Sequence, residues 1–273
     1  MLDMGKASLS TGPNATFRRL TAMPQAQITR ATEGGVPMSL TAETRETLKG
    51  ITTATITTTL LRHGLRNVWL RDTLPLREGQ ERVVGPAFTL RFVPAREDLA
   101  TPASWSSPIS TRAAIEDMPE GCVAVVDAMG VTDAAIFGDI LVSRMDQKGV
   151  AALVTDGKLR DIEGVMSTNI PIFCNGVACP PSVAGLTFVA WQQPIACGGV
   201  AFFPNDIIVA DKDGATLIPA AYLDVVLEEG PEQERKEGWI MEQVTKHGAK
   251  LPGLYPMNEE TAARYDAWKA EQS

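Results

Sequence analysis

The sequence predicts an α/β fold in which strands lie buried between layers of helices. Three short runs, 122–127, 150–155 and 171–174, consist almost entirely of apolar residues. An apolar run without polar alternation is typical of a strand that is covered on both faces. A helical segment from Gly138 to Lys148 separates the first two runs. Alternation of buried strands with helices favours a layered α/β architecture.

The N-terminal part of the fold is predicted to consist of two helices. Thr41 is placed to cap a helix that runs through Lys49. The second helix spans 54–63 and ends at Gly64, a residue that readily adopts the left-handed turn of a helix end. Threonines crowd the stretch 52–59, and we interpret them as β-branched residues that pack against the sheet or a neighbouring subunit.

A long strand, a loop and a helix are expected next. Residues 82–94 predict a strand with a kink at Gly85-Pro86, because proline cannot donate to the ladder of a sheet. The segment 100–108 is rich in Ser, Pro and Thr and predicts a surface loop. A helix is expected over 109–117.

After the third buried strand the pattern changes to short strands joined by tight turns. The runs 198–206, 207–211 and 215–219 predict a small β-meander. A helix over 220–246 follows, with an interruption expected at Gly230-Pro231. The turn-rich apolar segment 251–256 is a candidate contact for another subunit.

Length and composition indicate one large domain. The chain has 273 residues, of which 44% are hydrophobic and 21% are charged, so a sizeable core is available. We assign residues 39–273 to a single domain with a C-terminal helical arm. Residues 1–38 show a loose Gly/Pro pattern and predict a flexible extension.

Charge and cysteine content exclude several classes of partner. The net charge is −8 and no block of Lys or Arg stands out, so no nucleic acid is expected as a partner. No apolar run approaches the roughly 18 residues of a membrane span, so no membrane partner is expected either. No C-x-x-C pair occurs among the cysteines and only two histidines are present, which argues against a zinc site. The cysteines are Cys122, Cys174, Cys179 and Cys197, and three of the four lie in apolar or small-residue runs, so buried free thiols are expected. A cytoplasmic location of the protein is expected as well, because free thiols fit a reducing compartment.

The most informative motif is Gly138-Asp139-Ile140-Leu141, at the start of a predicted helix. Gly138 permits close approach of the backbone, and the amides of Ile140 and Leu141 have no acceptor within the helix. Together with the helix dipole, these amides form a site for a carboxylate. Asp139 has two interpretations: a helix N-cap, which we favour on sequence alone, or a carboxylate that handles a proton beside the bound anion.

A second motif, 155–161, follows the second buried strand. Asp156-Gly157 marks a turn at the carboxyl edge of the sheet, where ligands of open α/β sheets bind. As neighbours in sequence, Arg160 and Asp161 are expected to project in different directions. Arg160 would then clamp a carboxylate or enolate oxygen, while Asp161 meets a cation such as Mg²⁺. The alternative is an exposed ion pair of little energetic value.

These motifs resemble those of the RraA-like family. The resemblance runs from about Leu40 to Trp268 and rests on Gly138–Leu141, 154–161, Cys197-Gly-Gly-Val200, Pro204-Asn-Asp206 and Asp211-Lys-Asp-Gly214. Asn205 departs from the glycine usual in the family, but asparagine tolerates a left-handed turn. The resemblance implies an α-β-β-α sandwich of the swivelling β/β/α type. It also implies a homo-oligomer, a trimer or a dimer of trimers, with active sites between subunits.

The resemblance also implies roles for individual residues. The family includes metal-dependent 4-hydroxy-4-methyl-2-oxoglutarate and 4-carboxy-4-hydroxy-2-oxoadipate aldolases, as well as the ribonuclease E regulator that named it. By position, Asp161 would be the direct ligand of a divalent cation, for which Mg²⁺ is favoured and Mn²⁺ is the alternative. Arg160 would bind the pyruvyl oxygens and stabilise the enolate, and the Ile140 and Leu141 amides would hold the carboxylate. Asp139 would act through metal-bound water in proton transfer.

A glutamate from the C-terminal helix of a neighbouring subunit completes the site in such aldolases. Glu234 and Glu237 are both candidates for this role in the present chain, and the motifs do not choose between them.

The implied function is a divalent-metal-dependent aldolase. It would cleave a 4-hydroxy-2-oxo acid to pyruvate and a carbonyl compound through a metal-bound pyruvate enolate. Oxaloacetate decarboxylation gives the same enolate and is expected as a side activity. Two alternatives stay open: an RraA-type regulator of ribonuclease activity that acts by protein–protein contact, and a sugar-acid lyase or dehydratase that uses the same enolate. A methyltransferase is not supported, because the sequence has no glycine-rich nucleotide-binding turn.

The substrate beyond its pyruvyl half is left open by the motifs. The loop 100–108, with Trp105, and the segment 91–98 are candidates to shape that part of the pocket. Arg91 or Arg96 is positioned in sequence to meet a second carboxylate, and a surface role is an equal alternative.

Overall fold

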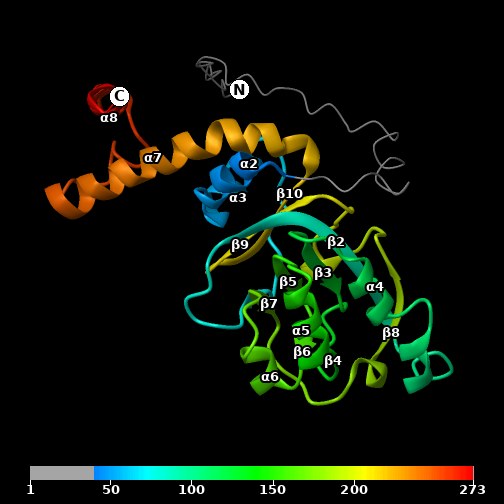
Figure 1. The fold of residues 1–273 in the computed structure, drawn as a ribbon. Coiled ribbons are helices and arrows are strands. Elements are labelled where there is room, and N and C mark those ends of the chain that lie inside the picture. Colours follow the sequence, from blue (N-terminus) through cyan, green and yellow to red (C-terminus); the bar gives the residue numbers. More distant parts are fainter. Residues whose placement is uncertain (1–39, 273) are drawn as a thin grey trace, which may run out of the picture.

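The centre of the fold is a mixed sheet of eight strands (Figure 1). The computed structural model describes residues 40–272, so the predicted extension 1–38 lies outside the described residues. The strands follow the order β1-β7-β5-β3-β2-β9-β10, and β8 pairs with β2 as well. Their bounds are β1 Leu74–Pro75, β2 Val83–Pro94, β3 Val123–Asp127, β5 Ala152–Thr155, β7 Ile172–Cys174, β8 Leu186–Trp191, β9 Ile207–Asp211 and β10 Gly214–Ile218. The three predicted buried strands are therefore β3, β5 and β7, which run parallel to one another.

Each face of the buried strands packs into its own apolar core. Ala124 and Val126 of β3 join the core beneath α4 Thr111–Asp117, α5 Asp139–Gln147 and α6 Ile162–Met166. Val123 and Val125 join the opposite core, which also contains side chains of β9, β10 and the helices α2 Ala42–Lys49 and α3 Thr53–Arg62. Successive side chains of these strands point to opposite faces of the sheet, and they are all apolar because both faces are buried. The mixed α/β class predicted from the sequence is confirmed.

The long strand β2 connects the two parts of the sheet. Its residues 83–86 pair with β9, whereas residues 87–91 pair with β3. The change of partner falls directly after Pro86, at the predicted kink. A side chain at Gly85 would place its Cβ 2.7 Å from the carbonyl oxygen of Gly121, so only glycine allows this close approach of two backbones.

Two predictions about the C-terminal part were wrong. The stretch 198–206 is not a strand: it holds a 3-10 turn, η3 Cys197–Gly199, and only an isolated bridge between Ile195 and Phe202. The two strands expected at 207–211 and 215–219 are present as the hairpin β9–β10, which belongs to the main sheet. The helix α7, Leu223–His247, also continues through Pro231 without interruption. A Cβ at Gly230 would lie 2.6 Å from Ile51, so α7 packs closely against the chain at the end of α2 beside this proline.

The C-terminal arm extends beyond the sheet (Figure 1). It consists of the second half of α7 and of α8, Glu259–Glu271, which the sequence analysis did not predict. Tyr265 of α8 packs edge-on against Trp239 of α7, with ring centroids 5.7 Å apart. These rings and Leu254 form a small apolar cluster separate from the two main cores.

The predicted surface loop 100–108 contains a short 3-10 helix, η1 Pro102–Ser106. The four cysteines are free, and three of them are buried, as predicted; Cys179 is exposed. Within residues 40–272, no helix combines the length and the apolar character that a membrane crossing requires.

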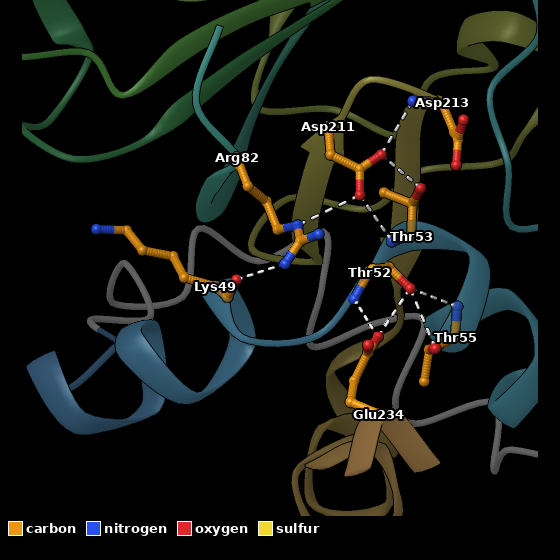
Figure 2. Close-up of polar contacts among 8 residues, drawn as sticks. All are labelled: Lys49, Thr52, Thr53, Thr55, Arg82, Asp211, Asp213 and Glu234. Atoms are coloured by element: carbon orange, nitrogen blue, oxygen red, sulfur yellow. Dashed lines mark hydrogen bonds and ion pairs between the residues drawn. The ribbon is translucent and has the colours of Figure 1, made fainter. Parts of the chain in front are cut away.

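The threonine-rich stretch has two roles rather than the single one predicted. Thr55 and Thr59 are buried, in keeping with packing. Thr52 and Thr53 instead bind two carboxylates at the start of α3 (Figure 2). Asp211 accepts hydrogen bonds from the amide and hydroxyl of Thr53. Burial raises the pKa of Asp211, but these hydrogen bonds and the charge of Arg82 lower it more, so its pKa lies below the ordinary value. Carboxylates at a helix N-terminus are favoured by the free amides and the dipole.

Candidate active site

The two sequence motifs lie side by side because two short strands pair. Strand β4, Ala135–Phe137, and strand β6, Lys158–Leu159, form a separate parallel two-stranded sheet. The amide of Arg160 continues this ladder by donating to the carbonyl oxygen of Phe137 at 3.0 Å. Gly138 follows β4 directly and Arg160 follows β6 directly, so the ladder places them next to each other. Neither strand was predicted.

Arg160 and Asp161 form an ion pair instead of diverging, which corrects the expectation from sequence. The Nε of Arg160 lies 3.0 Å from Oδ2 of Asp161. Asp161 adopts a left-handed conformation, with φ 53° and ψ 45°, at the N-terminal boundary of α6. That backbone turn, rare for residues with a side chain, lets the carboxylate fold back towards its neighbour. Both side chains are partly exposed, at 35% and 44%.

Two glycines make room for the two carboxylates. A Cβ at Gly138 would come well under 3.0 Å from Oδ2 of Asp161 and 3.4 Å from Cγ of Arg160. A Cβ at Gly164 of α6 would lie 2.6 Å from Cβ of Asp139 and also strike its carboxylate. Asp139 therefore lies against α6, and Asp161 lies against the start of α5. Glycine is therefore required at 138 and 164 because carboxylate side chains occupy the space that a Cβ would fill.

The start of α5 holds the carboxylate of Asp139, whereas the binding of a ligand carboxylate there stays a prediction. The cap residue is Gly138, and Asp139 is the first helical residue, so the interpretation of Asp139 as the N-cap was wrong. Its Oδ1 accepts a hydrogen bond of 2.7 Å from the Ile140 amide. The first backbone bond within the helix runs from Val142 to the Gly138 carbonyl, which leaves the preceding amides at the helix surface. Ile140 itself is 80% exposed.

These groups line one pocket of about 210 Å³. Its walls include the predicted groups of both sequence motifs, namely Gly138, Asp139, Ile140, Leu141, Arg160 and Asp161. Arg112 of α4 is a second cation in the lining, and its guanidinium lies 5.1 Å from the ring centroid of Trp105. The pocket thus combines two guanidinium groups, two carboxylates and a helix N-terminus. Arg112 was missed in the sequence, where only its place in a predicted helix was visible.

The donor set fits a hard divalent cation that keeps most of its water. Asp139 and Asp161 border this pocket and also an adjoining hollow that includes Glu163. Among the described residues, no group of three or more His, Cys, Asp or Glu side chains could enclose a metal ion. One or two carboxylates with water and ligand oxygens suit Mg²⁺, whereas a closed cage of protein ligands would suit Zn²⁺.

A buried carboxylate, predicted from the sequence only as part of a turn, holds the loops behind the site. Asp156, at the end of β5, accepts hydrogen bonds from the amides of Ala128, Gly130 and Gly198 at 2.8 to 3.2 Å. Burial raises the pKa of Asp156, and the three amides counteract that rise in part. Its contacts join three segments far apart in sequence, so no local pattern could have indicated them.

The two candidate glutamates lie on α7, outside the lining of this pocket. Oε1 of Glu234 accepts from the amide and the hydroxyl of Thr52, at 2.7 and 2.8 Å (Figure 2). Oε1 of Glu237, one helical turn further on, accepts from Gln233. Glu234 thus anchors α7 to α3 within the chain. The entry of either residue into a neighbouring subunit's site stays a prediction.

Comparison with known proteins shows the family of the chain. A family model described as "RraA-like: Aldolase/RraA" matches residues 53–217. A protein of Halalkalibacterium halodurans named "Putative 4-hydroxy-4-methyl-2-oxoglutarate aldolase" is 37% identical over 173 residues, which cover 63% of this chain and 75% of that protein. Protein DlpA of Legionella pneumophila is 31% identical over 153 residues, 56% of this chain but only 24% of its own length.

Solved structures show the same fold. The crystal structure of Streptomyces coelicolor RraAS2, described as an unusual member of the RNase ES inhibitor RraA protein family, has 33% sequence identity and a TM-score of 0.66. The match covers 74% of this chain and 97% of that one. An uncharacterized protein from Pseudomonas syringae has 24% identity and a TM-score of 0.67, which shows the fold alone.

Proposed function

The chain belongs to the RraA-like family, and from that premise we propose that it is a divalent-metal-dependent aldolase. It cleaves a 4-hydroxy-2-oxo acid to pyruvate and a carbonyl compound. The observation that carries the proposal is the convergence of Arg160, Asp161, Asp139 and the start of α5 on one pocket. The names of relatives such as the Halalkalibacterium halodurans protein support a lyase.

Substrate binding begins with its carboxylate. The amides of Ile140 and Leu141 receive it at the start of α5, where the carboxylate of Asp139 now accepts from Ile140. As the substrate takes that position, Asp139 is released to hold a water molecule beside the pyruvyl group. The guanidinium of Arg160 donates to the keto oxygen, with its Nε held in place by Asp161 at 3.0 Å. A fixed guanidinium stabilises the negative charge that develops on this oxygen during cleavage.

The reaction then consists of one bond cleavage and two proton transfers. A base takes the proton of the 4-hydroxyl, and the C3–C4 bond breaks. Its electron pair passes into the pyruvyl fragment as an enolate, while C4 leaves as a carbonyl carbon. Water held by Asp139 delivers a proton to C3 and yields pyruvate. Asp161 would hold the divalent cation, which supplies Lewis acidity at the keto and carboxylate oxygens when bound.

Pyruvate release tests the proposal directly. Oxaloacetate and 4-hydroxy-4-methyl-2-oxoglutarate are supplied with Mg²⁺, Mn²⁺ or EDTA to the wild type, Asp161→Ala and Arg160→Lys. We expect turnover that requires metal, is lost in Asp161→Ala and falls about 10-fold or more in Arg160→Lys, since lysine keeps the charge but loses the planar fork. Absence of turnover with every metal would overturn the aldolase proposal.

The likeness to RraAS2 supports a second candidate function, regulation of a ribonuclease by protein contact. The Asp161→Ala variant distinguishes the two candidate functions. A regulator that acts through its surface keeps its effect on ribonuclease cleavage in the Asp161→Ala variant, whereas an aldolase loses its activity. Ribonuclease assays with both forms of the protein make this comparison.

A further inference from the structure

A second pocket adjoins the one that holds Arg160 and Asp161. It has a volume of about 370 Å³ and lies between the segment 98–111 and the segment 182–189. We name it the distal pocket, and the first one the pyruvyl pocket. Trp105, Thr111 and Ser182 line both, so the two pockets are direct neighbours. A substrate longer than pyruvate that binds through Arg160 can therefore extend into the distal pocket.

The two pockets differ in their cationic side chains. Arg112 and Arg160 both line the pyruvyl pocket, and neither lines the distal one. Among the described residues that line the distal pocket there is no Lys or Arg, and the charged side chain is Asp98. Arg96, which binds Asp98 at 2.5 Å, has 68% of its side chain exposed and is not in the lining. A second carboxylate on the substrate would thus meet an acidic residue and lose hydration without a cation to replace it.

Apolar surface and hydroxyl groups make up the rest of the distal pocket. Leu186, Phe188 and Val189 of β8 form one wall. Thr111 stands at the junction with the pyruvyl pocket; it is only 7% exposed, and its hydroxyl makes no hydrogen bond with another described residue. The neighbouring Ser110 is different, because its hydroxyl caps α4 by accepting from Ala113 at 3.3 Å. The Thr111 hydroxyl is not among the buried atoms that lack a partner, so it is open to the pocket and available to a ligand hydroxyl.

We infer that the distal pocket selects an uncharged substrate tail. The substrate is a 4-hydroxy-2-oxo acid whose C4 substituent is an apolar or hydroxylated chain without a second carboxylate, and Thr111 bonds a hydroxyl of that chain. This inference rests on the proposed aldolase function. Cleavage of C3–C4 leaves the electron pair on the pyruvyl fragment, and C4 departs with its oxygen as a neutral aldehyde after loss of the hydroxyl proton. Arg91 and Arg96, the sequence candidates for a second carboxylate, line neither pocket.

The test compares substrates that differ in the tail alone. The value of kcat/KM for pyruvate release is measured with 4-hydroxy-2-oxohexanoate, 4,5,6-trihydroxy-2-oxohexanoate and 4-hydroxy-2-oxoglutarate, whose tails are ethyl, dihydroxyethyl and carboxylate. Oxaloacetate, which needs the pyruvyl pocket alone, is the reference. We expect both neutral tails to exceed the carboxylate tail by about 10-fold or more. A preference for the carboxylate tail, or no preference, with oxaloacetate turnover present would overturn this inference and leave the aldolase proposal intact. Loss of oxaloacetate turnover as well would overturn both.

Two substitutions locate the selection in the distal pocket. Thr111→Val removes the hydroxyl at nearly constant volume and is expected to lower kcat/KM for the trihydroxy substrate by about 5-fold or more. Thr111→Ser keeps the hydroxyl and is expected to keep the wild-type kcat/KM. Val183→Lys places a cation in the lining and is expected to shift the ratio of dicarboxylate to neutral turnover by about 10-fold towards the dicarboxylate. Thermal unfolding confirms that each variant is folded. An unchanged ratio in folded Val183→Lys would overturn the assignment of the tail to this pocket.

Discussion

The clearest test of the site geometry is the addition of one methyl group at Gly138. Its φ of −112° lies in the extended region, which any residue adopts, so Gly138→Ala introduces no backbone strain. The new Cβ would come well under 3.0 Å from Oδ2 of Asp161, whereas ordinary contacts begin near 3.4 Å. The carboxylate must therefore move by on the order of 1 Å, and Arg160, which is bound to it, moves too. A misplacement of that size costs roughly 100-fold in rate, or about 2.7 kcal/mol of transition-state stabilisation.

Stability should change little in the same variant, because the group that must move is the end of a half-exposed side chain. The assay is kcat/KM for pyruvate release from oxaloacetate, paired with the midpoint of urea unfolding. Gly238→Ala is the matched control: Gly238 lies in α7, nothing lies within 4 Å of its added Cβ, and activity should be retained with a gain of about 0.5–1 kcal/mol in stability. Full activity in Gly138→Ala would refute the placement of Asp161 in the reacting geometry.

Three further predictions follow from other contacts. Gly164→Ala drives a Cβ to 2.6 Å from Cβ of Asp139, near the stem of that side chain, so both activity and stability should fall, the latter by about 1–3 kcal/mol in urea unfolding. Asp161→Gly relieves a left-handed backbone, so the free energy of unfolding should stay equal or rise by about 1 kcal/mol while metal-dependent turnover disappears; a clear loss of stability would contradict this. Burial raises the pKa of Asp206 to about 6 from 3.8. The folded state thus holds its proton more tightly than the unfolded chain, and this contribution, present in full below pH 4, is lost as the pH rises through 6. The unfolding free energy of Asp206→Asn minus that of the wild type should therefore rise by roughly 2.5 kcal/mol between pH 4 and pH 8, and a flat difference would contradict the assignment.

The sequence was sufficient for the central strands because their apolar content is itself the cause of their burial. In β3, Val123 and Ala124 point to opposite cores, and both must be apolar for the strand to sit there. The same local logic identified Thr41 as the cap of α2, where its hydroxyl accepts from Thr44 at 3.0 Å. Asn205, which stands where the family has glycine, does adopt a left-handed turn with φ 71°, as its side chain tolerates. In each case the determining interaction lies within a few residues of the position itself.

Features that depend on distant partners were missed. The strands β4 and β6 are too short for any periodic pattern, and they exist because Arg160 and Phe137 meet through the backbone. α7 continues through Pro231, and beside it Gly230 packs on Ile51, which lies far away in sequence. The pairing of Arg160 with Asp161 follows from the left-handed turn at Asp161, and that turn is set by the meeting of α6 with the start of α5. The motifs therefore identified the residues of the site, whereas their mutual geometry required the fold.

Asp161 is more readily explained by function than by folding. Its left-handed backbone costs on the order of 1 kcal/mol, and glycine would adopt the same conformation without that cost. Its ion pair with Arg160 joins two partly exposed side chains, at 35% and 44%, and exposed pairs of this kind return between zero and about 1 kcal/mol. The two terms roughly cancel, so the carboxylate brings the folded chain no net stability. Gly138, meanwhile, has no side chain at the one place where a Cβ would displace that carboxylate. A protein that acted only through an outer contact surface would need neither feature. Their coincidence at one pocket is what an enzyme requires when it must hold a carboxylate and a guanidinium in fixed register against a substrate.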